Sequence, residues 1–160
     1  MWGRKKKKET KDHSRDKKQD LPMRDISLYE LRQAIQSFTA NLPEGIELQT
    51  IINTDNTIDY HFLAPYLKAI PHQTYYMSRE TYDVFEDKDR QIAIDLDRIQ
   101  QAVDKYVQQN SELPIIEGDP YRKVNFFKLE RAGLLTERPD RAYYITKDEY
   151  MITYQQPGSE

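Results

Sequence analysis

The chain has 160 residues, 38% of them hydrophobic and 32% charged, with a net charge of −3 and no cysteine. That length suits one domain or two very small ones, and the lack of cysteine excludes disulfide scaffolds, thiolate metal sites and thiol catalysis. No apolar run approaches the roughly 18 residues that span a bilayer, and no signal-peptide core follows the basic start. We therefore expect a cytoplasmic protein, with any membrane contact peripheral and at the inner surface.

The first 24 residues carry ten Lys/Arg against four Asp/Glu, a net charge of +6, which leaves −9 for the other 136. This segment has few large apolar residues to offset the entropy of ordering, so we expect residues 1–24 to be a disordered basic tail. An interfacial aromatic ring and five consecutive cations lie within it: Trp2, Arg4, Lys5, Lys6, Lys7 and Lys8. Such a set favours an anionic membrane surface, where each cation adds about 1 kcal/mol. Nucleic-acid binding and simple solvation of the tail are the alternatives.

The remaining chain matches itself at an offset of 68 residues. The apolar positions of residues 26–38 recur at 94–106, and TYYMSRETYDV (74–84) aligns with AYYITKDEYMI (142–152). Two separate matches at one offset predict an internal duplication, and chance similarity between amphipathic segments is the alternative. The two repeats are expected to span residues 25–92 and 93–157 and to form one compact body.

Each repeat is expected to begin with an amphipathic helix. The apolar residues from 28 to 38 are spaced 3, 4 and 3 apart, and the same spacing recurs from 96 to 106. Ser27, in a capping-box pattern with Glu30, and Asp95 are the predicted N-caps. Short β-branched strands are expected next, at 46–52 and 114–116.

A second helix is expected after these strands. TIDYHFL (57–63) fits a strand or a helix, but its counterpart KVNFFKL (123–129) follows Asp119-Pro120, a favourable helix start. We therefore predict a helix in both repeats, over about 120–132 in the second. Tyrosine-rich hairpins complete each repeat, at 74–85 and 142–154. The predicted fold class is α+β, two tandem α-β-α-β-β repeats with helices packed on antiparallel strands.

Two stretches carry a resemblance to known proteins. DLDRIQQAVDKYVQQNSELPII (95–116) and YYITKDEYMIT (143–153) look like a small uncharacterised protein family of Bacillus-type bacteria. The phrase IDYHFLAPYLKAIP (58–71) also resembles a helix-then-proline segment in the soluble parts of pilin-like surface proteins. The resemblance implies helices on antiparallel strands, and it supplies no activity, cofactor or site residue.

The sequence contains no P-loop, GxGxxG, GxSxG, HExxH or paired metal-ligand spacing, so no catalytic residue, cofactor or metal is predicted. His61 and His72 are the histidines outside the tail, and we interpret both as surface residues. A small-molecule enzyme is the third functional hypothesis, and it requires a pocket that joins one of these histidines to carboxylates.

Two further surfaces are candidates for binding. The tyrosine pairs of the hairpins place one ring on each face of a strand and form a possible partner patch: Tyr75, Tyr76, Tyr143 and Tyr144. A winged-helix interpretation of residues 129–154 would turn four cations toward phosphates: Arg122, Lys123, Lys128 and Arg131.

The leading functional hypothesis is a non-enzymatic interaction or adaptor protein. It has an unknown protein partner, and its cationic tail contacts an anionic membrane surface. A nucleic-acid-binding regulator that uses the tail and the basic C-terminal half is the alternative.

Overall fold

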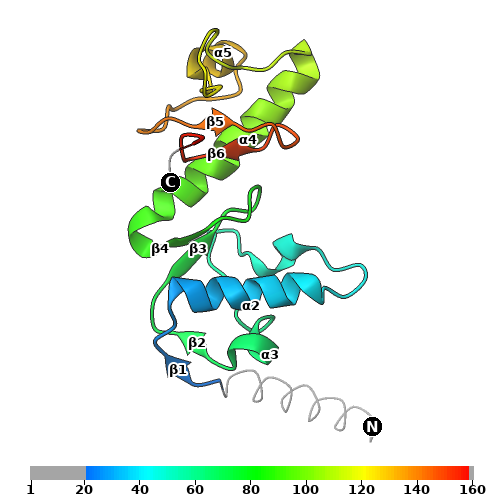
Figure 1. Cartoon of the computed structure of the whole chain (residues 1–160), viewed down its shortest axis with the longest axis vertical. Coiled ribbons are helices and arrows are strands. Elements are labelled where there is room, and N and C mark those ends of the chain that lie inside the picture. The colour runs from blue at the N-terminus through cyan, green and yellow to red at the C-terminus, as the bar shows by residue number, and fades with distance from the viewer. Residues whose placement is uncertain (1–20, 159–160) are drawn as a thin grey trace, which may run out of the picture. The chain divides into compact units, whose positions relative to one another are not determined.

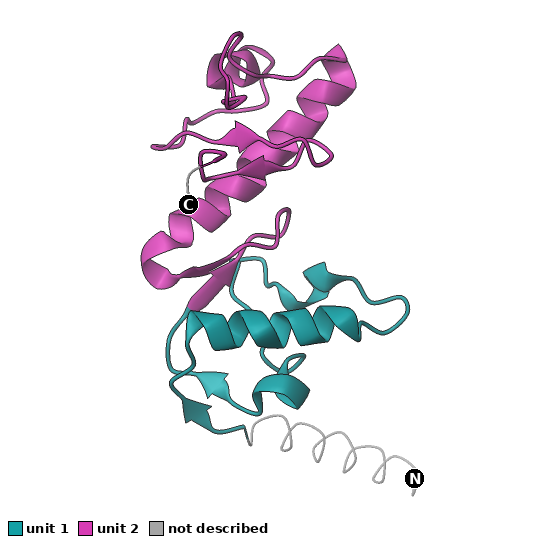
Figure 2. Ribbon diagram, viewed as in Figure 1, with its two compact units in different colours: residues 1–74 teal, residues 75–160 magenta. Residues whose placement is uncertain are grey.

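The structure, a computed structural model, describes residues 21–158. The chain divides into two compact units, unit 1 up to Thr74 and unit 2 from Tyr75 onward (Figure 2). The border predicted between the repeats, at residue 92, does not coincide with this division. The reason is that the hairpin after Thr74 packs on the long helix of unit 2.

Unit 1 is built around one amphipathic helix, α2, with short elements packed beside it (Figure 1). Its elements are β1 (Met23–Arg24), α2 (Leu28–Ala40), the 3-10 turn η1 (Leu48–Ile51), α3 (Ala64–Leu67) and β2 (Ile70–Pro71). The apolar stripe of α2 is buried as its spacing predicts: Leu31, Ala34, Ile35 and Phe38. Ser27 caps the helix, as predicted, because its hydroxyl accepts a hydrogen bond from the Glu30 amide (3.0 Å).

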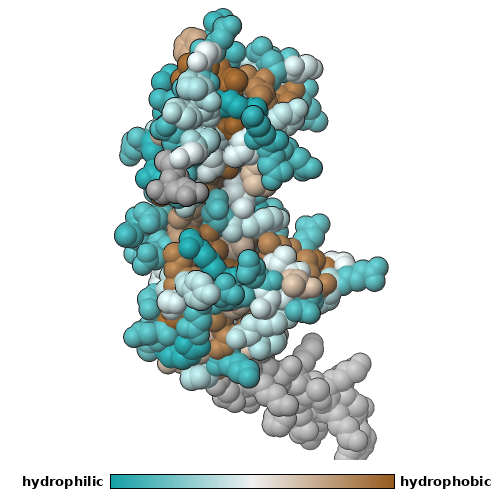
Figure 3. Space-filling model, viewed as in Figure 1, coloured by the Kyte–Doolittle hydropathy of each residue, from teal (hydrophilic) through white to brown (hydrophobic). Residues whose placement is uncertain are grey.

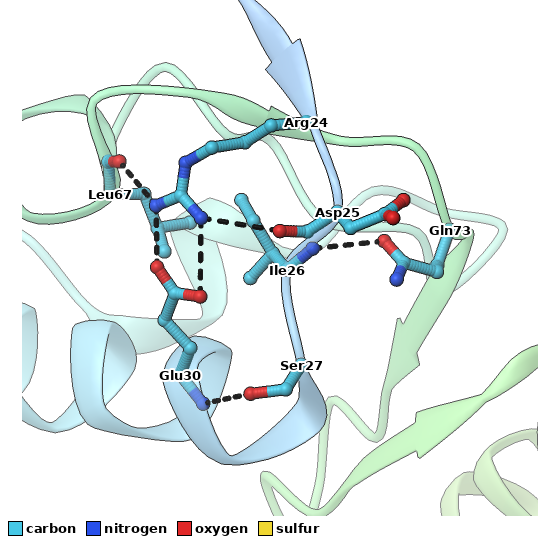
Figure 4. A network of polar contacts seen from close by, with 7 residues as sticks. All are labelled: Arg24, Asp25, Ile26, Ser27, Glu30, Leu67 and Gln73. Atoms are coloured by element: carbon cyan, nitrogen blue, oxygen red, sulfur yellow. Dashed lines mark hydrogen bonds and ion pairs between the residues drawn. The ribbon is translucent and has the colours of Figure 1, made fainter.

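The start of unit 1 extends into the predicted tail. β1 pairs in parallel with β2, Met23 opposite Ile70. The Arg24 guanidinium donates to both oxygens of the Glu30 carboxylate and to the Leu67 carbonyl oxygen at the end of α3 (Figure 4). The prediction that the tail runs to residue 24 is therefore wrong at its end, because residues 21–24 belong to the folded unit.

Unit 2 is built along the 21-residue helix α4 (Arg90–Asn110). The hairpin β3 (Tyr75–Met77) and β4 (Val84–Glu86) leads through η2 (Asp87–Asp89) into α4, and α5 (Phe126–Arg131), β5 (Tyr144–Ile145) and β6 (Ile152–Thr153) follow. Both hairpins and α5 pack on α4 (Figure 1). The core residues that α4 supplies are fully buried or nearly so: Ala93, Leu96, Ile99, Ala102 and Val103.

The beginning of α4 differs from the prediction. The helix starts at Arg90, so Asp95 lies in its second turn and is not an N-cap. Ile92 and Ala93 are buried in the core, and this burial stabilises an additional first turn that the first repeat does not have.

The predicted second helices are also wrong in extent. Residues 57–63 are not helical, and α3 begins only at Ala64. In unit 2 the Ile116 amide donates to the Lys123 carbonyl (2.9 Å), which closes a loop where the sequence predicts the first helical turns. Asn125 caps α5 instead of Asp119, since its side chain accepts from the Lys128 amide. The strands predicted before these helices are also wrong. Leu48–Ile51 forms the 3-10 turn η1, and only the isolated bridges Ile52–Ile58 and Ile115–Val124 remain.

The two tyrosine-rich hairpins form as predicted, and their registers agree at the offset of 68. Met77 pairs with Val84, and Ile145 pairs with Ile152. The Ser78 amide donates to the Asp83 carbonyl (2.9 Å), and the Thr146 amide donates to the Met151 carbonyl (2.8 Å). The α+β class is confirmed, and the duplication stays a prediction that these registers support.

Candidate functional site

The tail residues proposed for an anionic surface, Trp2, Arg4 and the four lysines from Lys5 to Lys8, lie outside the described residues. The other candidate residues can be placed within their units.

The two tyrosine pairs do not form one exposed patch. Tyr75 and Tyr143 are buried, with 3% and 0% of their surface exposed, and Tyr143 belongs to the core of unit 2. Tyr76 and Tyr144 are half-buried, and the guanidinium of Arg90 stacks over the Tyr76 ring at 5.3 Å. The buried members are thus unavailable to a partner. Tyr143 lies in the core along α4, whereas in the first hairpin Tyr76, not the buried Tyr75, packs against that core. The rings exposed on the hairpin loops are instead Tyr82 and Tyr150, which are equivalent at the offset of 68.

The four cations proposed for nucleic acid do not form a free basic face. Lys128 forms an ion pair with Glu112 (3.6 Å), and Arg122 lies half-buried with its Nη2 near the Thr146 carbonyl oxygen (3.5 Å). Arg131 stacks over the Phe127 ring at 5.9 Å. Lys123 lies at the end of the loop that the hydrogen bond from the Ile116 amide closes. Several of these cations therefore stabilise the local structure.

Exposed apolar side chains accompany these cations. We define the tip of unit 2 as the loop 116–123 and the first turn of α5. Ile116 and Tyr121 are each 40% exposed, and Phe127 is 56% exposed. Asp119 holds the loop, because one of its carboxylate oxygens accepts from the amides of Tyr121 (3.1 Å) and Lys123 (2.9 Å).

A buried polar cluster lies at the other end of α4. The carboxylate of Asp95 is 95% buried and accepts hydrogen bonds from Gln91 Nε2 (2.9 Å) and Arg98 Nη2 (2.8 Å). The Tyr143 hydroxyl lies 3.4 Å from its second oxygen. Burial, and next the Asp95 charge, raise the pKa of Tyr143, so this hydroxyl stays protonated as a donor.

A pocket of about 470 Å³ lies beside this cluster, between one face of α4 and residues 137–140. Arg98 lines it while donating to the Glu137 carbonyl oxygen (3.2 Å), and Arg138 is tied to Glu130. The Asp95 cluster therefore has its charges paired and its hydrogen bonds made, which is typical of a network that holds structure.

Neither histidine lines this pocket. His61, in unit 1, lies in a turn with its Nδ1 3.1 Å from the Asp59 carboxylate, and both side chains are exposed. Among residues 21–158, no group of three or more His, Asp or Glu side chains could hold a metal ion. Within the same range, no helix is both long and apolar enough to cross a bilayer.

The comparison that decides the family covers nearly all of the described chain. Residues 21–154 match the model of DUF3939, described as a protein of unknown function. The chain belongs to the DUF3939 family. No curated protein and no solved structure matches it. The prediction of an uncharacterised family is thus confirmed, while its assignment to Bacillus-type bacteria stays a prediction. The DUF3939 match also begins at residue 21, where the described fold begins.

The candidate residues that the sequence analysis missed in this DUF3939 protein are the apolar ones of the tip. Ile116 and Phe127 directly follow Ile115 and Phe126, apolar residues that pack against the core, so their exposure had no local signal. Alignment with the first repeat gives a signal of this exposure, because Phe127 aligns there with the polar His61.

Proposed function

We propose that this DUF3939 protein is a non-enzymatic adaptor that attaches to an anionic phospholipid surface through its basic N-terminal segment. One observation carries the proposal: five consecutive cations and the single tryptophan of the chain fall within the first eight residues, while residues 25–160 have a net charge of −9. An acidic body is repelled by an anionic surface, so the cationic segment is the part that would hold it there.

The described units support a binding role over a catalytic one. In the pocket beside Asp95, Asp95 and Arg98 neutralise each other, and the Tyr143 pKa is raised. A general base or nucleophile needs a group poised to exchange a proton near neutral pH. Two of the four cations at 122–131, Arg122 and Lys128, are held by neighbouring groups, so this face gives the nucleic-acid alternative less support than the tail gives the membrane.

The test is co-sedimentation of the full chain with vesicles of phosphatidylglycerol and phosphatidylcholine in equal parts. Replacing Arg4 and Lys5 to Lys8 together by Gln removes five charges worth about 1 kcal/mol each at such a surface, so binding should fall by at least about a hundredfold. Trp2 is the single tryptophan of the chain, and its fluorescence should shift to the blue when vesicles are added.

Vesicles of phosphatidylcholine alone are the control, and they should bind neither protein. Equal binding of both proteins to the anionic vesicles, or no binding by the wild type, would refute the membrane role. Tighter binding of the wild type to duplex DNA than to vesicles at the same salt would favour the nucleic-acid alternative.

A further inference from the structure

The loops that follow the first helix of each repeat share one backbone pattern. In unit 1 the Asn53 amide donates to the Thr57 carbonyl (2.8 Å), and the Asp59 amide donates to the Ile51 carbonyl (2.8 Å). In unit 2 the corresponding bonds run from Ile116 to Lys123 (2.9 Å) and from Asn125 to Pro114 (2.8 Å). The bridges Ile52–Ile58 and Ile115–Val124 lie between these bonds in each unit. The pattern aligns the two loops residue by residue, with three more residues in the second.

The aligned positions differ in polarity. Asn53 aligns with Ile116, which is 40% exposed. His61, two residues after Asp59, aligns with Phe127, two residues after Asn125 and 56% exposed. Tyr121 falls in the longer loop of the second repeat. The unit 1 loop makes the same hydrogen bonds with polar side chains, so the apolar side chains at the tip are not needed to form it.

The charge of the aligned segments differs in the same sense. Residues 53–65 contain two Asp and no Lys/Arg, for a net charge of −2. Residues 116–131 contain four Lys/Arg against three Asp/Glu, for a net charge of +1. The apolar tip is therefore flanked by cations on a unit that is acidic elsewhere. Figure 3 shows apolar surface at the end of unit 2 that carries α5.

From this contrast we infer that the tip of unit 2 is a second lipid-contact site, at which Ile116, Tyr121 and Phe127 enter the interface of an anionic bilayer. Aromatic and aliphatic side chains with neighbouring Lys and Arg are the composition that binds at this depth. Lys123 and Arg131 would contact lipid phosphates, while the exposed rings and Ile116 would enter the headgroup region. The inference rests on the proposed function, since it assumes the same anionic surface.

The test exchanges the tip residues for those of the aligned loop. The full-length double variant Ile116→Asn with Phe127→His should retain the loop hydrogen bonds, because Asn53 and His61 occupy those positions in unit 1. On equal mixtures of phosphatidylglycerol and phosphatidylcholine, its partition coefficient should fall about ten- to a hundredfold as the apolar contact is lost. The blue shift of Trp2 at saturating lipid should be unchanged, because the tail is intact.

Two further variants sharpen the test. Tyr121→Ser changes only the loop and leaves α5 unaltered, so it tests the site even if the double exchange disturbs α5. It should weaken binding by a smaller factor than the double exchange, because it removes a single ring. Tyr29→Ser is the matched control, because this ring of α2 is 72% exposed in unit 1 and should have no effect.

Unchanged vesicle binding by both tip variants, with binding still lost when the tail cations are removed, would overturn the inference and leave the proposed function standing. Absence of wild-type binding would overturn both. Self-association of the wild type that the tip variants abolish, with vesicle binding unchanged, would assign the tip to a second copy of the chain and overturn the lipid role.

Discussion

Helices α2 and α4 are equivalent in the predicted repeats, yet the residue at one equivalent position is an exposed cap in α2 and a buried side chain in α4. Leu31 and Ile99 are equivalent and both fully buried, and Phe38 and Tyr106 are equivalent and nearly buried. The position before the stripe differs, because Ser27 starts α2 as an exposed cap whereas Asp95 lies buried inside α4. The comparison teaches that the apolar stripe sets the common architecture, while additional polar groups are specific to one repeat.

The largest expected effect tests whether the two stripes are equivalent. Leu31→Ala and Ile99→Ala each remove a fully buried side chain, so each should lower the free energy of unfolding by about 2–5 kcal/mol. Urea denaturation followed by circular dichroism measures both. A loss of unfolding free energy below about 1 kcal/mol at either position would show that the two stripes are not equivalent, because such a site would not belong to a close-packed core.

The next effect separates a cap from a buried cluster. Asp95→Ala leaves Gln91, Arg98 and the Tyr143 hydroxyl without their acceptor and should cost about 1–3 kcal/mol of unfolding free energy. Ser27→Ala, at the equivalent position, removes one capping bond and should cost about 1 kcal/mol. The same urea titration compares them, and a larger cost for the serine would reverse the roles assigned here.

A smaller effect is expected in the hairpin loops. Tyr82 and Tyr150 each adopt a left-handed backbone with φ of 63°. Glycine relieves the strain of about 1–2 kcal/mol but adds flexibility to the unfolded chain, so Tyr82→Gly and Tyr150→Gly should each stabilise by up to about 1 kcal/mol. Thermal unfolding of both variants measures the change. Shifts of opposite sign would show that the two loops are not equivalent.

The smallest effect concerns the network that joins β1 to α2. The hydrogen bond from Arg24, opposed in part by burial, lowers the pKa of Glu30 below its usual value. Its stabilising contribution is therefore present above the unfolded-state pKa and is lost as the pH falls through the lower folded-state value. Glu30→Gln should be slightly less stable near neutral pH and should match the wild type in acid. A difference that grows in acid would contradict this sign.

The sequence predicted the elements that carry a regular apolar pattern over many residues, and it missed those whose limits depend on contacts with residues distant in the chain. The stripe from Leu28 to Phe38, its counterpart from Leu96 to Tyr106 and the alternation in both hairpins were sufficient to place α2, α4 and the four strands of unit 2. The start of α4 was missed because the burial of Ile92 and Ala93 is a tertiary effect. Likewise, Asp119-Pro120 has the composition of a helix start, but the Asp119 side chain holds the loop amides instead.

The candidate sites were predictable to a lesser degree. Charge counting located the basic tail, which needs no folded context. Which tyrosine of each pair is buried depends on what packs on each face of its hairpin, and alternation alone allows either. Tyr143 lies in the core along α4, whereas Tyr76, and not the buried Tyr75, packs against that core. To predict the exposure of Ile116 and Phe127, one has to align them with the loop of unit 1, because apolar residues next to core positions are ordinarily assigned to the core.

The central claim is that the tip of unit 2 contacts lipid while the aligned loop of unit 1 does not. The chain contains no cysteine, so a single one can be labelled at a chosen position. A nitroxide attached to Tyr121→Cys and, separately, to Asp55→Cys would report immersion through its collision rates with oxygen and with a water-soluble relaxant. With anionic vesicles, the label at 121 should gain access to oxygen and lose access to the aqueous relaxant, and the label at 55 should stay aqueous. Two labels that both stay aqueous on bound protein would contradict the account.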